Sequence, residues 1–312
     1  MSNRNLSGPP AAGGGRNGRV LICLKVFRAQ MTDNDPMYFT DTVTVTPAVP
    51  RPAGAARPAA APVFLPREHG SWFLVLEPLA LGLLIAPSWA GGALAVTALA
   101  AFFIRRPLKP ALSAVHSRRR REAREVVVLW SALVVAGLFE LLVLGEVRAL
   151  WPLGPAVLLG GCFLAFDLEG EGRAEAAEIA GSAAFAFLPA ACATLAGEPA
   201  VTGLVLAGLA LARSLPAVMV VRAGLRQAKG ETPAPGLPRV VSLLAFALLV
   251  SFVLLRLAPV AVLIPGALLL ARAGWLLARS RPAWPARRIG QLEAAWGVLY
   301  LLVLVANWPS PA

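Results

Sequence analysis

Long runs of apolar residues, separated by short polar stretches, dominate the chain after Pro66. A transmembrane helix needs about 20 apolar residues to cross a hydrocarbon core of ~30 Å. Nine runs reach or approach this length, and they cover residues 70–86, 89–104, 125–144, 151–166, 176–196, 200–220, 239–257, 259–278 and 289–307. The pattern predicts an all-α fold, a polytopic membrane bundle of about nine transmembrane helices.

The part of the chain before this bundle has a different composition. Its first portion is rich in Gly, Asn and Arg, and residues 47–62 are rich in Pro and Ala. Such a segment buries too little apolar surface to offset the entropy of ordering. The sequence therefore predicts a disordered N-terminal tail over residues 1–63 and a helical transmembrane domain over residues 64–312.

Composition and charge support a membrane protein and predict its orientation. The chain is 57% hydrophobic and 15% charged, with a net charge of +12. Its Lys and Arg cluster between the apolar runs, which favours contact with a lipid bilayer and its anionic headgroups over nucleic acid. The connections on one predicted side hold only Arg148 and Arg256 as basic residues. The positive-inside rule therefore predicts a cytoplasmic N terminus and an extracytoplasmic C terminus in a bacterial inner membrane.

Residues 65–78, LPREHGSWFLVLEP, place charged groups at the start of the first span. Glu68 and His69 lie at the membrane edge, and Glu77 lies roughly 12 Å deeper at ~1.5 Å per residue. A carboxylate at that depth costs about 2.5–3.5 kcal/mol, so it needs a partner, water or a function. His69 and Glu77 share a helix face, which we expect to line a cytoplasm-facing polar cavity. The three are candidate catalytic residues, although a structural hydrogen bond would equally explain His69.

The sixth span carries Arg213 at a depth similar to that of Glu77, so we expect the two side chains to pair. The pair has two interpretations: a structural link between two helices, or part of a ligand-binding site. Arg272 and Glu293 lie in the same half of the membrane and are expected to extend the network.

A basic connection over residues 105–124 is a second candidate binding region. It is long enough for a short interfacial helix after Pro110. Arg105, Arg106 and Lys109 in this stretch either contact anionic lipid or bind a phosphate or diphosphate at the mouth of the cavity.

An acidic stretch, DLEGEGRAEAAE, covers residues 167–178, where the neighbouring connections are basic. Glu171, Glu175 and Glu178 are spaced to share one helix face. Acids at a helix N-terminus are favoured by the helix dipole, which explains part of the cluster. The functional interpretation is that these carboxylates bind magnesium with a phosphorylated ligand, or accept protons.

The segments PREHG, RRPLK, DLEGEGRAEAAEIAG and RSLPAVMVVRAGLR occur in this order between the apolar spans. In these motifs the chain resembles the YwiC-like family of bacterial integral membrane proteins over about residues 64–308. That family has no settled biochemical activity. A more remote similarity, to UbiA-type intramembrane prenyltransferases, implies Mg²⁺ held by Asp167 and Glu171 and a prenyl diphosphate substrate. The first Asp-rich motif of those enzymes has no counterpart here.

Three classes of function remain open: a small-molecule binding protein or transporter, a metal-dependent enzyme, and a structural or assembly factor. The sequence contains no Walker motif, no GxGxxG after a strand and no HExxH. We favour a YwiC-like membrane protein whose cytoplasm-facing polar cavity binds or transports a small molecule, with a phosphorylated or isoprenoid compound as the candidate ligand. A UbiA-like prenyltransferase is the alternative.

Overall fold

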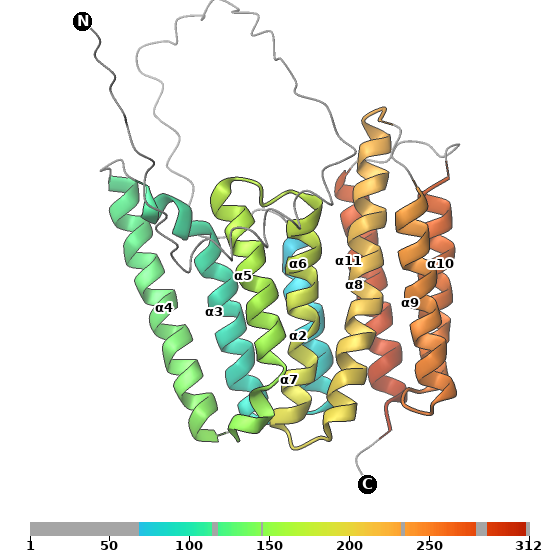
Figure 1. Cartoon of the computed structure of the whole chain (residues 1–312), viewed down its shortest axis with the longest axis horizontal. Coiled ribbons are helices and arrows are strands. Elements are labelled where there is room, and N and C mark those ends of the chain that lie inside the picture. Colours follow the sequence, from blue (N-terminus) through green and yellow to red (C-terminus); the bar gives the residue numbers. More distant parts are fainter. Residues whose placement is uncertain (1–68, 114–117, 145, 232–234, 279–285, 310–312) are drawn as a thin grey trace, which may run out of the picture. The chain divides into compact units, whose positions relative to one another are not determined.

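The computed structural model describes residues 69–113, 118–144, 146–231, 235–278 and 286–309 (Figure 1). These ranges belong to one compact unit, Pro58–Ala312. The tail predicted over residues 1–63 lies outside the described residues, as does Glu68. His69 begins the first helix, but its side chain is outside the description.

The described part of the chain is built from α-helices and two short 3₁₀ helices, with no strand among the described residues. In chain order the helices are α2 (His69–Ile85), α3 (Trp89–Leu112), α4 (Arg118–Leu144), η1 (Val147–Leu150), α5 (Leu153–Glu169), α6 (Glu175–Ala186), α7 (Leu188–Leu195), α8 (Ala200–Ala228), α9 (Gly236–Leu254), η2 (Val260–Val262), α10 (Leu263–Leu276) and α11 (Ala286–Asn307).

Contiguous helices combine into segments that follow the nine predicted apolar runs within a few residues at most ends. Thus η1 leads into α5, η2 leads into α10, and α6 and α7 meet at Phe187. Within the described residues, seven segments are long and apolar enough to cross a membrane, and the two shorter ones are Trp72–Ile85 and Val260–Leu276. The predicted all-α membrane bundle is confirmed, and the protein is embedded in a lipid bilayer.

The basic connection after the second span differs from its prediction. Helix α3 continues past residue 104 to Leu112 despite Pro107 and Pro110, and α4 begins at Arg118. The expected interfacial helix after Pro110 is therefore replaced by extensions of two bundle helices. Arg and Lys are good helix formers, and their long side chains reach the aqueous interface from a helix that is still continuous.

Burial differs strongly between the helices. About 67% of the apolar window in α6–α7 and 56% of that in α8 are buried, against 11% in α4. Helix α8 contacts α6, α7, α9 and α10, whereas α4 packs mainly against α3 (Figure 1). The exposed apolar side chains of α4 therefore face lipid, which solvates them as well as another helix would.

The packing of α3 against α4 depends on a glycine. Gly137 in α4 faces Thr97 in α3, and any side chain at position 137 would collide with the Thr97 hydroxyl. That hydroxyl donates a 2.8 Å hydrogen bond to the Ala93 carbonyl, so its polarity is satisfied within α3. Small residues let membrane helices approach closely, because helix association in lipid depends on packing rather than on hydrophobic burial.

Successive spans alternate in direction, so their connections gather at two ends of the bundle (Figure 1). One end, where α3, α5, α8 and α10 finish, carries most of the Lys and Arg of the connections, and we call it the basic end. The opposite end carries Arg148 and Arg256. This arrangement is the charge asymmetry behind the predicted orientation. Which end faces the cytoplasm stays a prediction.

Candidate functional site

An ion pair joins α2 and α8 inside the apolar part of the bundle. Arg213 Nε lies 3.3 Å from Glu77 Oε1, and the Arg213 side chain is buried. The pairing expected from their equal depth in the sequence is therefore present. Its role in binding a ligand stays a prediction.

The same arginine connects α8 to α11, and α11 in turn connects to α10. Arg213 Nη1 lies 3.5 Å from Glu293 Oε2, and Arg213 Nη2 donates a 2.9 Å hydrogen bond to the Glu293 backbone carbonyl. Arg272 of α10 forms a further ion pair with Glu293. We call Glu77, Arg213, Arg272 and Glu293 the charged layer. As expected from their similar depth, the last two residues extend the network.

A glycine on α11 leaves space for the side chains of the charged layer that come from α2 and α8. A side chain at Gly297 would collide with Glu77 Oε2 and would lie 3.3 Å from Arg213 Nη2. One turn further along, the Tyr300 hydroxyl donates a 3.0 Å hydrogen bond to the Leu209 carbonyl of α8. Sequence reasoning missed Gly297 and Tyr300. Their helical spacing from Glu293 was the signal that could have identified them.

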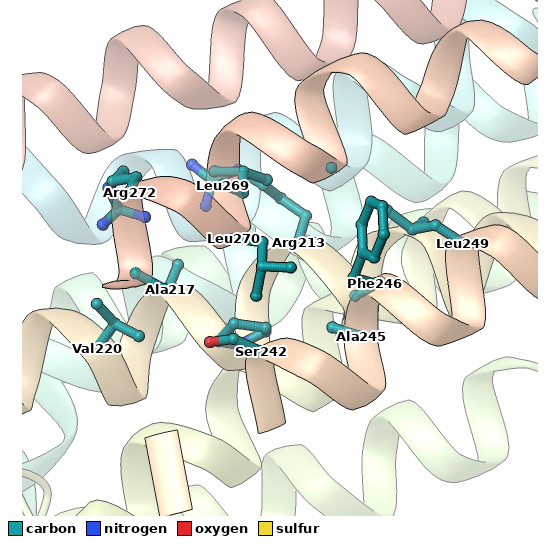
Figure 2. Close-up of a pocket in the computed structure, with 14 residues that line it drawn as sticks. Arg213, Ala217, Val220, Ser242, Ala245, Phe246, Leu249, Leu269, Leu270 and Arg272 are labelled. Atoms are coloured by element: carbon teal, nitrogen blue, oxygen red, sulfur yellow. The ribbon is translucent and has the colours of Figure 1, made fainter. Parts of the chain in front are cut away.

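A cavity of about 20 Å³ lies between α8, α9 and α10, beside the charged layer (Figure 2). Arg213 and Arg272 line it together with Ser242, Ala245 and Phe246 of α9. Its volume is enough for one water or a small ion. The wider cytoplasm-facing cavity that the sequence predicts stays a prediction.

At the basic end, Arg105 of α3 binds Asp167 of α5. Arg105 Nε donates to Asp167 Oδ2 at 3.2 Å, and Nη2 donates to Oδ1 at 3.3 Å. The Arg105 guanidinium also lies over the Phe163 ring, 4.4 Å from its centroid. Two charge-assisted hydrogen bonds and a cation–π contact orient this arginine. Arg105, predicted to bind a phosphate, and Asp167, predicted to bind magnesium, thus bind each other.

Magnesium binding by Asp167 and Glu171 stays a prediction, and the described contacts of Asp167 do not favour it. Both Asp167 oxygens face a guanidinium, whose charge would repel a second cation. No three His, Cys, Asp or Glu side chains among the described residues gather as a metal site. Glu171 lies just after α5, where its N–H donates to the Phe166 carbonyl at 2.8 Å. Magnesium at this position would require Arg105 to move away.

Glu175 and Glu178, in the first turn of α6, face Arg222 of α8. Arg222 Nη1 donates to Glu178 Oε2 at 3.0 Å and to the Arg173 carbonyl at 2.7 Å, while its Nε lies 3.9 Å from Glu175 Oε2. The predicted helix face is present for these two acids but does not include Glu171, because α6 begins only at Glu175. The sequence does not predict their partner, because Arg222 follows an apolar run as one of the many basic residues that indicate orientation.

The remaining candidates of the basic connection lie on α3. Arg106 and Lys109 are both exposed. Lys109 Nζ is close to Gly170, at the end of α5, where an added Cβ would lie 3.4 Å from it. The structure thus places most of the described site residues in two groups, to neither of which Arg106, Lys109 and Glu171 belong. One is the charged layer, and the other comprises the Arg105–Asp167 and Arg222–Glu175/Glu178 contacts, which we call the rim pairs.

Comparison with known proteins supports a single family. No curated protein and no solved structure gives a significant match to the chain, so the similarity to UbiA-type enzymes has no support there. A family model described as YwiC-like protein matches residues 65–193, a range that contains Glu77 and the Arg105–Asp167 pair and ends before Arg213. Over residues 65–193 the chain is therefore similar to the YwiC-like family, and its apolar helices fit a membrane protein of that type.

Proposed function

We propose that the protein binds a small polar solute at the charged layer and carries it across the membrane. The observation that carries this proposal is the placement of two arginines and two glutamates on four apolar helices, where three ion pairs connect them in the order Glu77, Arg213, Glu293 and Arg272. Charged side chains inside membrane helices are rare, and they mark solute or proton pathways more often than they serve as ordinary packing.

A purely structural role explains this layer less well. Replacing buried ion pairs by well-packed apolar residues is often neutral or stabilising, so joining helices does not require four charges. In a membrane, each charged side chain at the centre of a helix also costs about 2.5–3.5 kcal/mol of insertion free energy. Retaining all four is reasonable if at least one of them exchanges its partner for a solute or a proton during a functional cycle.

The proposal includes a sidedness, in which the basic end faces the cytoplasm of a bacterial cell. In that orientation the exposed Arg106 and Lys109 lie at the level of anionic lipid headgroups, which they would contact. A reporter fused after Trp308 should then read extracytoplasmic, and one inserted between residues 230 and 235 should read cytoplasmic. Reporters that read from the same side would overturn this orientation.

Solute binding can be tested by thermal unfolding of the purified full chain in gluconate buffer. The panel would hold amino acids, amines, carboxylates, inorganic phosphate, and diphosphate with or without Mg²⁺. A solute at 100 times its dissociation constant stabilises the native state by about 2.7 kcal/mol. The proposal expects at least one stabilising solute, and no stabilisation by it in the double variant Glu77→Gln/Arg213→Gln, which removes one positive and one negative charge.

The same panel separates the competing functions. Stabilisation by a prenyl diphosphate that requires Mg²⁺ and is lost in Asp167→Asn would instead support the prenyltransferase alternative. If folded wild-type protein is stabilised by none of the solutes, the binding proposal fails and a structural role becomes the better explanation. For a stabilising solute, uptake into proteoliposomes should be lost in Glu77→Gln if transport is coupled to protons.

A further inference from the structure

The cavity of about 20 Å³ between α8, α9 and α10 presents cationic groups to an otherwise mostly apolar enclosure (Figure 2). Arg213 and Arg272 line it, and both side chains are buried. Arg272 Nε has no hydrogen-bond partner among the described residues. A buried donor without an acceptor is costly, so a small acceptor that enters the cavity would be stabilised there.

The polar group of α9 in this lining does not supply that acceptor. Ser242 Oγ donates a 2.7 Å hydrogen bond to the Pro238 carbonyl of its own helix. The rest of the α9 lining is apolar, with Ala245, Phe246 and Leu249. The chemistry of the cavity is therefore set by the two guanidinium groups, which favour an anion.

The charge of the surrounding layer decides how an anion can enter. Two arginines and two glutamates make the layer neutral as it stands, so a monoanion alone would leave an uncompensated negative charge in a low dielectric. Uptake of one proton by a carboxylate removes that excess. Glu77 is the better candidate, because among the described residues its ion pair is with Arg213, whereas Glu293 contacts both Arg213 and Arg272.

Among the described residues, other titratable groups on the helices that pack around Glu77 have partners or contacts of their own. Tyr300 of α11 donates its hydroxyl proton to the Leu209 carbonyl, and Cys192 of α7 packs against Gly82. Near the basic end, the rim pairs engage Arg105 of α3, Glu175 and Glu178 of α6, and Arg222 of α8.

We propose that this cavity is a binding site for a small monoanion, of the size of chloride, nitrate or formate, that binds together with one proton. The proton from bulk water adds to a Glu77 carboxylate oxygen, which releases Arg213, and the anion then binds between Arg213 and Arg272. No other bond forms or breaks, and the layer stays neutral. This inference rests on the proposed function and names the class of its solute and the coupled ion.

The test measures the thermal unfolding midpoint of the detergent-purified full chain at constant ionic strength. Sodium chloride, nitrate or formate replaces sodium gluconate, whose anion is too large for the cavity, at pH 6 and at pH 8. A small anion should raise the midpoint by roughly 2–6 °C at pH 6. The rise should be smaller at pH 8, because coupled uptake of one proton weakens anion binding by up to about tenfold per pH unit.

Four variants locate the site. Glu77→Gln imitates the protonated carboxylate, so its anion-dependent shift should be equal at both pH values. Arg272→Gln should lose the shift. Ala245→Val fills the cavity without changing any charge and should also lose it, whereas Ala247→Val, on the exposed side of the same helix, should keep it.

Several results would overturn the inference. One is that the midpoint of folded wild-type protein stays the same when any of the three anions replaces gluconate. The others are a shift in the wild type that does not depend on pH, and a shift that persists in Ala245→Val. If another solute of the wider panel stabilises the protein while these anions do not, the anion site fails and the proposed function stands. If no solute of either set stabilises it, both fail.

Discussion

Arginine–carboxylate contacts occur in this bundle at two depths, with the same chemistry in different surroundings. In the charged layer the side chains of Arg213 and Arg272 are each 6% exposed, whereas those of Arg105 and Arg222 at the rim are 30% and 28% exposed. Water screens a rim pair and solvates either ion if its partner is lost. A buried ion has no such substitute, so its partner matters far more.

The two groups also connect different parts of the chain. The rim pairs join α3 to α5 and α6 to α8 near the ends of these helices. The charged layer joins α2 to α8, α10 and α11, and so brings together residues that are more than 200 positions apart in the sequence. Both groups consist of arginines and carboxylates, so residue type does not distinguish them. The comparison teaches that depth in the bundle does: the rim pairs join helix ends, and the buried charged layer is the site of the proposed function.

Removing Arg213 should have the largest effect on stability. Arg213→Gln leaves Glu77 without its partner in a low dielectric, at a cost of about 3–5 kcal/mol in the free energy of unfolding. The double variant Glu77→Gln/Arg213→Gln should be less destabilised than Arg213→Gln alone. A detergent-denaturation titration measures both, and strictly additive losses would contradict the pairing.

A smaller but still large effect is expected from crowding the charged layer without changing its charge. Gly297→Ala pushes a methyl group against Glu77 and Arg213 and should destabilise the protein by about 1–3 kcal/mol. Gly290→Ala, on the same helix with nothing within 4 Å of the added Cβ, is the matched control and should be neutral or slightly stabilising. Equal effects of the two substitutions in the same titration would show that the close approach at Gly297 is unimportant.

The rim pairs should respond weakly and in a salt-dependent way. Asp167→Asn keeps the shape of the side chain but removes the charge that binds Arg105, and partial exposure limits the loss to about 0.5–1 kcal/mol. Raising the salt from 0.1 to 1 M should shrink this difference, since the Debye length falls from about 10 to 3 Å. The loss in Arg213→Gln should change little over the same range, and a comparable salt dependence would refute the contrast in depth.

The smallest effect is expected for a pair on the helix surface. Arg118 contacts Glu122 one turn further along α4, and its side chain is 93% exposed. Arg118→Gln should leave the thermal unfolding midpoint unchanged within error, because an exposed pair gains little over hydration. A clear loss of stability would mean that the start of α4 has a further partner.

Much of the fold was readable from the sequence because the membrane imposes simple rules. A span must be apolar over about 20 residues and must satisfy its backbone within a helix, so hydropathy alone located the nine segments. The extension of α3 to Leu112 and the start of α4 at Arg118 were missed, since charged residues can continue a helix beyond the apolar core. Depth arguments also identified the Glu77–Arg213 pair and its extension.

The sequence by itself determined the class of this protein, its membrane segments, its charge asymmetry and the depth of each intramembrane charge. Only the tertiary structure decided which charges meet: that Asp167 binds Arg105 rather than standing free for a metal, that Arg222 holds Glu175 and Glu178, and that Gly297 makes room for Glu77. The physical reason is that depth along a helix follows from counting residues. Rotation and neighbour choice follow from side-chain packing between helices distant in sequence, for which hydropathy carries no information.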